Sequence, residues 1–295
     1  MRAALLMLGS SLFFGLMAVA IRLASKSLHT FEIAFFRNFF GLIAASPLLL
    51  KHGTQILRTT QFPRYILRCV IGVLGMFCGF WAIGHLPLAQ AISLSYSTPL
   101  FVTIAAVWML GEQVRARRWA AVAIGFIGVL MIVRPGSSNF TLGTLVAISA
   151  AVLSALVSIQ IKQLSRTEPA DRIVLYTTML WVPMSLLPAL FVWQWPHGIT
   201  WLWVAAAGTM GTSGHMLWTR ALKVGDVSAL SPISFMQLPV VAVFGWLLFD
   251  ERLDRWTVLG AAIIFSANAY IAHREAQLAR RHASQAPTEA AQPNE

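Results

Sequence analysis

The chain alternates between long apolar windows and short polar connections, and ten of the windows are long enough to cross a bilayer. A membrane-spanning helix needs about 20 mostly apolar residues. The connections are rich in Gly, Pro, Ser and Asn, which interrupt helices. The pattern therefore predicts an all-α integral membrane protein with ten transmembrane helices, at roughly residues 4–23, 33–50, 65–84, 89–110, 119–133, 142–161, 173–192, 201–221, 227–249 and 256–272.

One stretch of this pattern occurs twice. The first copy runs from Trp81 to Glu112 and the second from Trp218 to Glu251. Each copy passes through a short loop into an apolar window that contains a Pro, and each ends at an acidic residue. The two glutamates lie 139 positions apart, which leaves room for about five spans per copy. An odd number of spans inverts the second copy across the bilayer, and inverted repeats with broken helices are typical of secondary transporters.

The composition fits a membrane protein better than a soluble domain. The chain is 57% hydrophobic and only 11% charged, and its mean hydropathy is +0.69. A net charge of +11 raises the question of nucleic-acid binding. Here the charges lie in the short connections between spans and form no basic face with interleaved aromatic residues. We therefore expect no nucleic-acid partner.

The distribution of basic residues predicts the orientation in the membrane. If the N-terminus lies inside, 16 of the 22 Lys and Arg residues fall on the inner side, five on the outer side and one, Arg37, within a span. Because basic residues are enriched in cytoplasmic loops, both termini are predicted to be cytoplasmic. The first window also resembles a signal peptide, with Ala18-Val19-Ala20 as a cleavage site. Its counterpart near residues 154–162 is internal, so we expect the first window to be retained as a helix.

Several motifs of the two copies resemble those of the drug/metabolite transporter superfamily, in particular the ten-span EamA-type permeases. Asp250 departs from the pattern, because the first copy has Gly at the equivalent position. The resemblance covers residues 4–273. Its motifs are Leu94-Ser95-Tyr96-Ser97-Thr98-Pro99, Leu110-Gly111-Glu112 and Gly125-Phe126-Ile127-Gly128 in the first copy, and Leu230-Ser231-Pro232, Pro239 and Phe249-Asp250-Glu251 in the second.

This resemblance implies a fold, a mechanism and a location. Two inverted five-helix repeats, residues 1–135 and 142–273, would surround a central cavity lined mainly by helices 1–4 and 6–9. Residues 274–295 are polar and then rich in Ala, Gln and Pro, which predicts a disordered cytoplasmic tail. Members of the family carry amino acids, nucleotide derivatives, vitamins, organic acids and toxic compounds. The resemblance also implies a multi-pass protein of the bacterial inner membrane.

Arg37 is the strongest candidate for substrate binding. Ionisable groups inside a membrane are costly and often functional, and none of the 11 acidic residues falls in the middle of a span. Arg37 shares a helix face with small residues, so this face is expected to meet protein. A guanidinium that lines a cavity suits a carboxylate or a phosphate. The structural alternative is that Arg37 extends to the membrane surface or bonds helix-end carbonyls.

His215 is the second ionisable candidate. It shares its predicted face with Gly208, Gly211 and Trp218, deep in the eighth span. With an ordinary pKa of about 6.5, a histidine can couple a conformational change to protons. The alternative is a neutral histidine that bonds one helix to another.

Amides, aromatic residues and prolines complete the set of candidates. Buried amides bond helix to helix or bind a ligand, and aromatic rings pack against lipid or stack on a planar ligand. Prolines within spans break the helix and would lie near the moving parts. The polar and aromatic candidates are Asn38, Trp81, Tyr96, Ser97, Gln160, Tyr176, Trp218, Phe235 and Gln237, and the candidates for helix breaks and gating are Pro99, Pro232 and Pro239.

No enzyme constellation is present in the sequence. It contains no HExxH, GxSxG or Walker motif, and Cys69 and Cys78 fit neither a redox motif nor a metal site. We therefore expect no enzyme activity, cofactor or metal.

The predicted function is secondary transport of a small organic metabolite by alternating access, with an anionic or zwitterionic substrate favoured. The alternatives are an exporter of aromatic or amphipathic compounds or amino acids, and a membrane accessory subunit that transports nothing. The predicted partners are a small-molecule substrate and the lipid bilayer, and the protein is expected to be a monomer or a homodimer.

Overall fold

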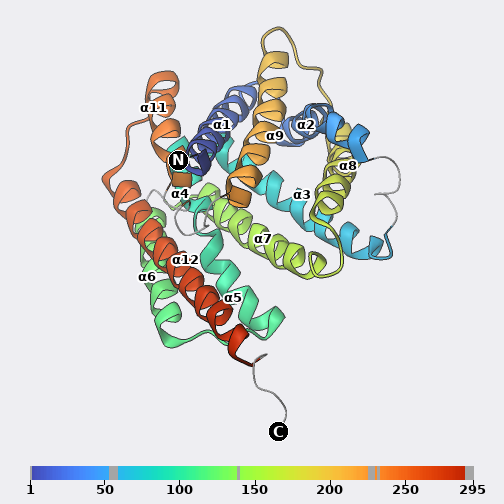
Figure 1. Ribbon diagram of the computed structural model, residues 1–295. Helices are drawn as coiled ribbons and strands as arrows, with labels where there is room; N and C mark the ends of the chain where they lie inside the picture. Colours follow the sequence, from blue (N-terminus) through green and yellow to red (C-terminus); the bar gives the residue numbers. More distant parts are fainter. Residues whose placement is uncertain (1, 53–58, 138–139, 225–229, 231–232, 290–295) are drawn as a thin grey trace.

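The computed structural model describes residues 2–52, 59–137, 140–224, 230 and 233–289, and these residues form helices and no strand (Figure 1). Each of the ten predicted windows contains helical residues among those that the structure describes. The helices are α1 (Arg2–Ala24), α2 (Thr30–His52), α3 (Phe62–His85), α4 (Leu88–Ser95), α5 (Thr98–Leu110), α6 (Ala116–Val133), α7 (Leu142–Leu164), α8 (Ala170–Ala189), the 3-10 turn η2 (Leu190–Val192), α9 (Thr200–Val224), α11 (Gln237–Phe249) and α12 (Arg255–Glu289).

Seven helices in the described part of the chain are long and apolar enough to cross a membrane. One of these seven is formed by α4 and α5 together, and α11 is a shorter apolar helix. Large apolar side chains cover the outside of the bundle; Trp108 and Phe191, for example, are 85% and 89% exposed. Such a surface is suited to lipid and not to water. The predicted all-α fold is therefore confirmed.

The two-repeat organisation is visible in the helix positions. α1 and α7 begin at residues 2 and 142, α2 and α8 at 30 and 170, α5 and α11 at 98 and 237, and α6 and α12 at 116 and 255. The displacement between the repeats is thus almost constant along the whole chain. Tyr96 and Phe235, which this displacement makes equivalent, stack on each other with ring centroids 4.0 Å apart. Equivalent residues that touch must lie near the axis that relates the two repeats.

Glycines let helices of the two repeats approach closely. A Cβ atom on Gly208 of α9 would lie 2.7 Å from the backbone oxygen of Arg37 in α2. Cβ atoms on Gly128 of α6 and Gly260 of α12 would lie 2.7 Å and 2.5 Å from each other's carbonyl oxygens. Small residues of this kind replace hydrophobic burial as the basis of helix packing in lipid. The pair α6 and α12 lies side by side at one edge of the bundle (Figure 1).

The predicted helix breaks fall near the starts of two helices. Pro99 is the second residue of α5, and Pro239 is the third residue of α11. A proline is tolerated in a first turn, because the N–H that it lacks would have no partner within the helix. Pro232 lies outside the described residues. We expected the chain after His273 to be disordered; in the structure α12 continues as a helix to Glu289.

Candidate functional site

A cavity of about 250 Å³ lies among five helices of both repeats, α2, α3, α7, α8 and α9. All five belong to the set that the family resemblance implied. No acidic residue is among the described residues that line it. These residues are Arg37, Gly72, Gly75, Met76, Phe80, Ser154, Val157, Trp181 and His215.

Arg37 presents a guanidinium to this cavity from the first half of α2. The residue is only 9% exposed. Its Nη1 donates a hydrogen bond to Oδ1 of Asn38 (3.0 Å), and Nδ2 of Asn38 donates to Oγ of Ser185 in α8 (3.2 Å). The Nε atom of Arg37 is buried and has no hydrogen-bond partner among the described residues. Asn38 thus orients the guanidinium, and the Nε donor is left without a described partner in this conformation.

Glu32 does not neutralise Arg37, although it lies five residues earlier in the same helix. Its Oε2 accepts a hydrogen bond from the backbone N–H of His29 (2.9 Å), and its Oε1 accepts one from the backbone N–H of Gln194. This carboxylate therefore caps the start of α2 and ties it to the segment after α8. The positive charge of Arg37 faces the cavity, and no described carboxylate forms an ion pair with it.

Trp181 supplies a second open donor from α8. Its Nε1 is buried and, within the described part of the chain, has no hydrogen-bond partner. The indole ring lies against Gly72 of α3, where an added Cβ would be 3.2 Å from Cζ2 and 3.3 Å from Nε1. Sequence reasoning missed Trp181, because tryptophans are common in spans and only the fold shows which one faces a cavity.

The two donors lie against equivalent glycines of the two repeats. Gly72 in α3 and Gly211 in α9 are 139 positions apart. A Cβ atom on Gly211 would lie 2.9 Å from Nη2 and 3.3 Å from Nε of Arg37. Each third helix of a repeat thus leaves room for a donor side chain from the other repeat, Trp181 in one case and Arg37 in the other.

His215 completes the polar lining from α9. Its ring meets Phe14 of α1 edge to face, with centroids 5.0 Å apart. It lines the same cavity as Arg37. Because the lining holds a cation and an imidazole but no described carboxylate, its electrostatic character is positive.

The candidates in the fourth and ninth spans form a separate cluster. The hydroxyl of Tyr96 donates to the backbone oxygen of Ser234 (2.7 Å) and lies 3.3 Å from Oε1 of Gln237, while its ring stacks on Phe235. The hydroxyl of Ser97 donates to the backbone oxygen of Leu94 (2.6 Å). The contacts of Tyr96 hold the two helix breaks together, and none of these groups lines the cavity at Arg37.

Four further candidates also lie outside this cavity. Trp81 stacks on His85 with centroids 3.9 Å apart, and Tyr176 stacks on Tyr65 at 4.6 Å. Gln160 is buried on α7 and its Oε1 has no partner in the described ranges, while Trp218 is 43% exposed. Of the predicted side chains, the structure therefore brings Arg37 and His215 to the cavity, with Asn38 supporting Arg37.

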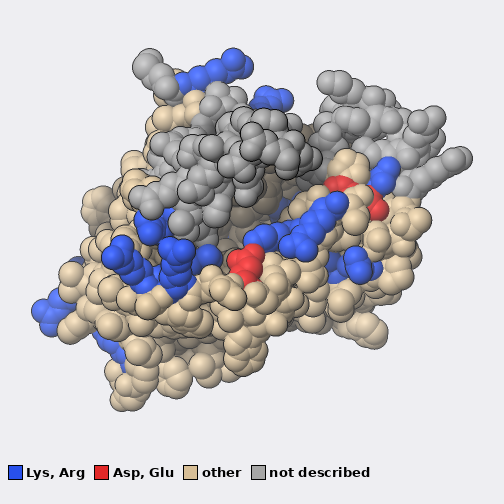
Figure 2. Space-filling model, turned by 60° about the horizontal axis from the view of Figure 1, so that its bottom comes forward, with Lys and Arg blue, Asp and Glu red and all other residues tan. Residues whose placement is uncertain are grey.

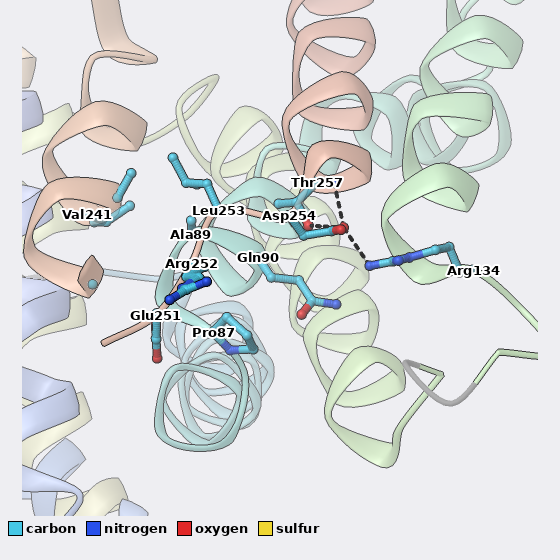
Figure 3. Close-up of a pocket in the computed structure, with 12 residues that line it drawn as sticks. Pro87, Ala89, Gln90, Arg134, Val241, Glu251, Arg252, Leu253, Asp254 and Thr257 are labelled. Atoms are coloured by element: carbon cyan, nitrogen blue, oxygen red, sulfur yellow. Dashed lines mark hydrogen bonds and ion pairs between the residues drawn. The ribbon is translucent and has the colours of Figure 1, made fainter. Parts of the chain in front are cut away.

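A second pocket, of about 280 Å³, lies where α4, α6, α11 and α12 meet, and Figure 3 shows its lining. Arg134 and Asp254 form an ion pair of 2.5 Å at one side of it. Asp254 also caps the start of α12, because its Oδ2 accepts a hydrogen bond from the N–H of Thr257. Glu251 lies at the opposite side (Figure 3) and pairs with Arg22. Because ion pairs and helix caps already engage these charged groups, this pocket is a weaker candidate for a substrate site.

The EamA-like transporter family matches this chain twice, over residues 1–134 and 141–272. The chain belongs to this family. The predicted recognition, the predicted membrane fold of two inverted five-helix repeats and the expectation that the protein is not an enzyme are thereby confirmed. The fold and the relatives make it a multi-pass membrane protein that transports small molecules.

Curated relatives differ in what they carry. The chain is 34% identical to a riboflavin transporter of Vibrio cholerae, over 95% of this chain and 96% of that protein. It is 30% identical to an S-adenosylmethionine uptake transporter of Rickettsia felis, with 88% of each chain covered. It is also 30% identical to a pseudopaline exporter of Pseudomonas aeruginosa, over 88% of this chain and 91% of the exporter. Similar sequences thus serve different substrates and both directions of transport.

A solved crystal structure shares the fold. It aligns with a TM-score of 0.63 over 95% of this chain and 98% of its own, at 21% sequence identity. At this identity the likeness establishes the fold and carries no information on the substrate.

Proposed function

We propose that this protein is a secondary transporter of the bacterial inner membrane that binds a small anionic or zwitterionic metabolite in the cavity at Arg37. The observation that carries the proposal is the pair of open donors, Nε of Arg37 and Nε1 of Trp181, on one cavity without a described acid. A buried donor left without an acceptor costs about 1–3 kcal/mol. A ligand that brings acceptors relieves this cost at both donors.

The chemistry of the two donors favours a carboxylate or a phosphate over a cation. A guanidinium binds such oxyanions through parallel, charge-assisted hydrogen bonds. A cationic substrate would have to approach Arg37 without a compensating carboxylate in the described lining. Met76, Phe80 and the indole of Trp181 provide apolar walls for the rest of the ligand. A zwitterion fits if its anionic end meets Arg37.

The relatives support transport but leave the substrate and the direction open. One is named for riboflavin, one for S-adenosylmethionine uptake and one for pseudopaline export. Export of aromatic or amphipathic compounds is the second candidate function, and the apolar cavity walls are the observation that favours it. Alternating access between the repeats, residues 1–135 and 142–273, serves either substrate class.

The arrangement of charges supports cytoplasmic termini. Figure 2 shows Lys and Arg side chains spread over the face that carries the connection between α5 and α6 and the C-terminal end of α12, with few acidic residues. Arg115 lies in the connection between α5 and α6, Arg117 and Arg118 lie in the first turn of α6, and Lys162 near the end of α7 contacts Glu112 of the same connection. Basic residues are enriched on the cytoplasmic side of membrane proteins. We therefore infer that this face, and with it both termini, lies in the cytoplasm.

The test is ligand-dependent stabilisation of the purified protein in detergent. The panel holds organic acids, amino acids, nucleotides, riboflavin, S-adenosylmethionine and cationic drugs. A ligand at 100 times its dissociation constant stabilises the protein by about 2.7 kcal/mol, which a thermal unfolding curve resolves. We expect anions or zwitterions to stabilise the protein, and cations to have no effect.

Matched variants connect the effect to the cavity. Arg37→Gln should abolish the stabilisation, whereas Arg68→Gln should not, because Arg68 is also buried but bonds Thr177 outside this cavity. Trp181→Phe should weaken it, whereas Trp81→Phe should leave it unchanged. Stabilisation by aromatic cations alone, unaffected by Arg37→Gln, would contradict the proposal and favour the second candidate function.

A further inference from the structure

Two ion pairs occupy equivalent positions in the two repeats. Nη2 of Arg22 lies 3.1 Å from Oε1 of Glu251, and Nζ of Lys162 contacts Oε1 of Glu112. Arg22 and Lys162 are 140 positions apart, and Glu112 and Glu251 are 139 apart. The repeat therefore makes the same contact twice, once with the first repeat supplying the cation and once with the second.

The glutamates are held by helix ends of the same construction. α5 is followed by Gly111 (φ 66°) and α11 by Asp250 (φ 53°), both in the left-handed region. The N–H of Glu112 then donates to the oxygen of Ala106 (3.3 Å), and the N–H of Glu251 donates to that of Gly245 (3.1 Å). Each bond reaches six residues back across a residue in the left-handed region, so the two helices end in the same way. Each ending directs a carboxylate toward the neighbouring repeat.

The cations lie at equivalent places as well. Arg22 is two residues before the end of α1, and Lys162 is two residues before the end of α7. One pair thus joins α1 to the end of α11, and the other joins α7 to the end of α5. Both pairs cross from one repeat to the other, at opposite faces of the membrane because the repeats are inverted. Contacts of this kind must change when the two halves move relative to each other.

We propose that these two ion pairs are the gates of the transporter, and that each holds the cavity closed on its own side of the membrane. Opening toward one side breaks the pair on that side and keeps the other intact. This proposal concerns the opening of the cavity and does not depend on which substrate occupies it.

The two pairs differ in how strongly they are held. The side chains of Arg22 and Glu251 are 20% and 16% exposed, against 53% and 31% for Lys162 and Glu112. Oε2 of Glu251 also accepts a hydrogen bond from the N–H of Leu88 at the start of α4 (2.7 Å), and Nη1 of Arg22 donates to the oxygen of Ile83 (2.8 Å). Water screens the exposed pair more than the enclosed one. The Lys162–Glu112 side is therefore the side that opens first from this conformation.

The experiment measures access to the cavity from each side of the membrane. A single reporter, Ser154→Cys, is placed in the cavity of a chain in which Cys69 and Cys78 are replaced by Ala. A membrane-impermeant maleimide is added to right-side-out and to inside-out vesicles. Glu251→Gln should raise labelling from the Arg22 side by about fivefold or more, the lower end of coupling between linked sites, and lower it from the other side. Glu112→Gln should have the opposite effect.

A neighbouring ion pair serves as the matched control. Arg134 and Asp254 pair at 2.5 Å on the same pocket as Glu251 (Figure 3), but this pair has no counterpart in the other repeat, because the residue equivalent to Asp254 is Arg115. Asp254→Asn should leave labelling unchanged from both sides. The reversed pair Arg22→Glu with Glu251→Arg should return labelling toward that of the parent chain.

Other outcomes overturn the proposal. If Glu251→Gln and Glu112→Gln change labelling in the same direction, or leave it unchanged while the unfolding temperature shows that both variants are folded, the pairs only cap helix ends. If a glutamate variant does not fold, Arg22→Gln and Lys162→Gln test the same two contacts from the other partner. If no ligand of the panel binds, but the two glutamate variants still change labelling in opposite directions, the proposed cavity function is contradicted and the gate proposal is supported.

Discussion

The two repeats have the same helix framework but place different side chains around the cavity. Arg37 of α2 corresponds in the other repeat to Thr177 of α8, and Trp181 corresponds to Gly41. His215 of α9 corresponds to Met76 of α3. The polar chemistry of the cavity therefore comes from positions that the repeat does not share.

Other features are shared. Gly72 and Gly211 are equivalent and both lie against a donor of the opposite repeat. The two ion pairs and the two left-handed helix ends are equivalent as well. Motion between two inverted halves needs the same contacts on each side, whereas one substrate needs only one set of binding groups. The comparison thus separates residues that serve movement from residues that serve recognition.

The largest effect on ligand binding is expected when the cavity charge is moved to the other repeat. Arg37→Thr, which installs the residue of the second repeat, should weaken binding of an anionic ligand about 10- to 100-fold, because a hydrogen bond to a charged group contributes about 1.5–3 kcal/mol. Adding Thr177→Arg should not restore binding, since residue 177 contacts Arg68 and not the cavity. Isothermal titration of the three proteins measures this. Recovery in the double variant would show that equivalent positions are interchangeable.

The next test places the same methyl group on both equivalent glycines. Gly211→Ala puts a Cβ 2.9 Å from Nη2 of Arg37 and 2.8 Å from Sδ of Met17, so the guanidinium must move. Overpacking costs about 1–3 kcal/mol, and we expect binding to weaken about fivefold to tenfold. Gly72→Ala meets Trp181 at 3.2 Å and should have a smaller effect.

Gly79→Ala is the control for these two variants, because its Cβ would meet only Ala150, at 3.9 Å. Ligand titration of all three should give the order Gly211, Gly72, Gly79. A larger effect at Gly72 than at Gly211 would show that the indole, and not the guanidinium, positions the ligand.

Much of the fold could be predicted from the sequence, because the bilayer dictates the length of each apolar window. The window at 142–161, for example, becomes α7 at Leu142–Leu164. Pro99 and Pro239 also indicated where helices are interrupted, because proline is tolerated in the first turn of a helix and destabilises its interior. These features depend on neighbours in the sequence.

The site was less predictable, because its contacts join distant parts of the chain. Arg37 could be found as a charge in an apolar window, but Trp181 gains its role from Gly72, on another helix of the other repeat. Tyr96 and Phe235 were predicted as candidates for substrate binding, and in the structure they stack on each other. The partner of Glu251 is Arg22, far away in the chain, and no local pattern indicates it. Comparing the two repeats position by position is the signal that finds such pairs.

A smaller effect is expected at the two left-handed helix ends, where the repeats differ by one side chain. Gly111→Ala should destabilise the protein by about 1 kcal/mol, because a Cβ disfavours positive φ and no atom lies within 4 Å to compensate. Asp250→Gly should stabilise it by up to about 1 kcal/mol. Unfolding temperatures in detergent measure both. Changes of the same sign would show that the side chain of Asp250, and not its backbone, determines the stability of this end.

The smallest effect is a pH dependence that only the second repeat should have. Glu168, in the connection between α7 and α8, accepts hydrogen bonds from Thr59 (2.6 Å) and Arg172 (2.6 Å), whereas the first repeat has Leu28 at the equivalent position. Burial alone would raise the pKa of Glu168, but the bonds from Thr59 and Arg172 and the charge of Arg172 lower it below its ordinary value.

A carboxyl group whose pKa is lowered on folding stabilises the protein above its unfolded pKa, about 4.3 for Glu, and this contribution is lost as the pH falls through the folded pKa. Glu168→Gln should therefore lower the unfolding temperature at pH 7 and make it less sensitive to acid below about pH 4.3. Glu112→Gln, which removes a carboxylate from the end of a helix in the first repeat, is the matched control. If Glu168→Gln leaves the acid limb of the unfolding curve unchanged, the contacts with Thr59 and Arg172 do not couple this carboxylate to folding, and the difference between the two connections has no effect on stability.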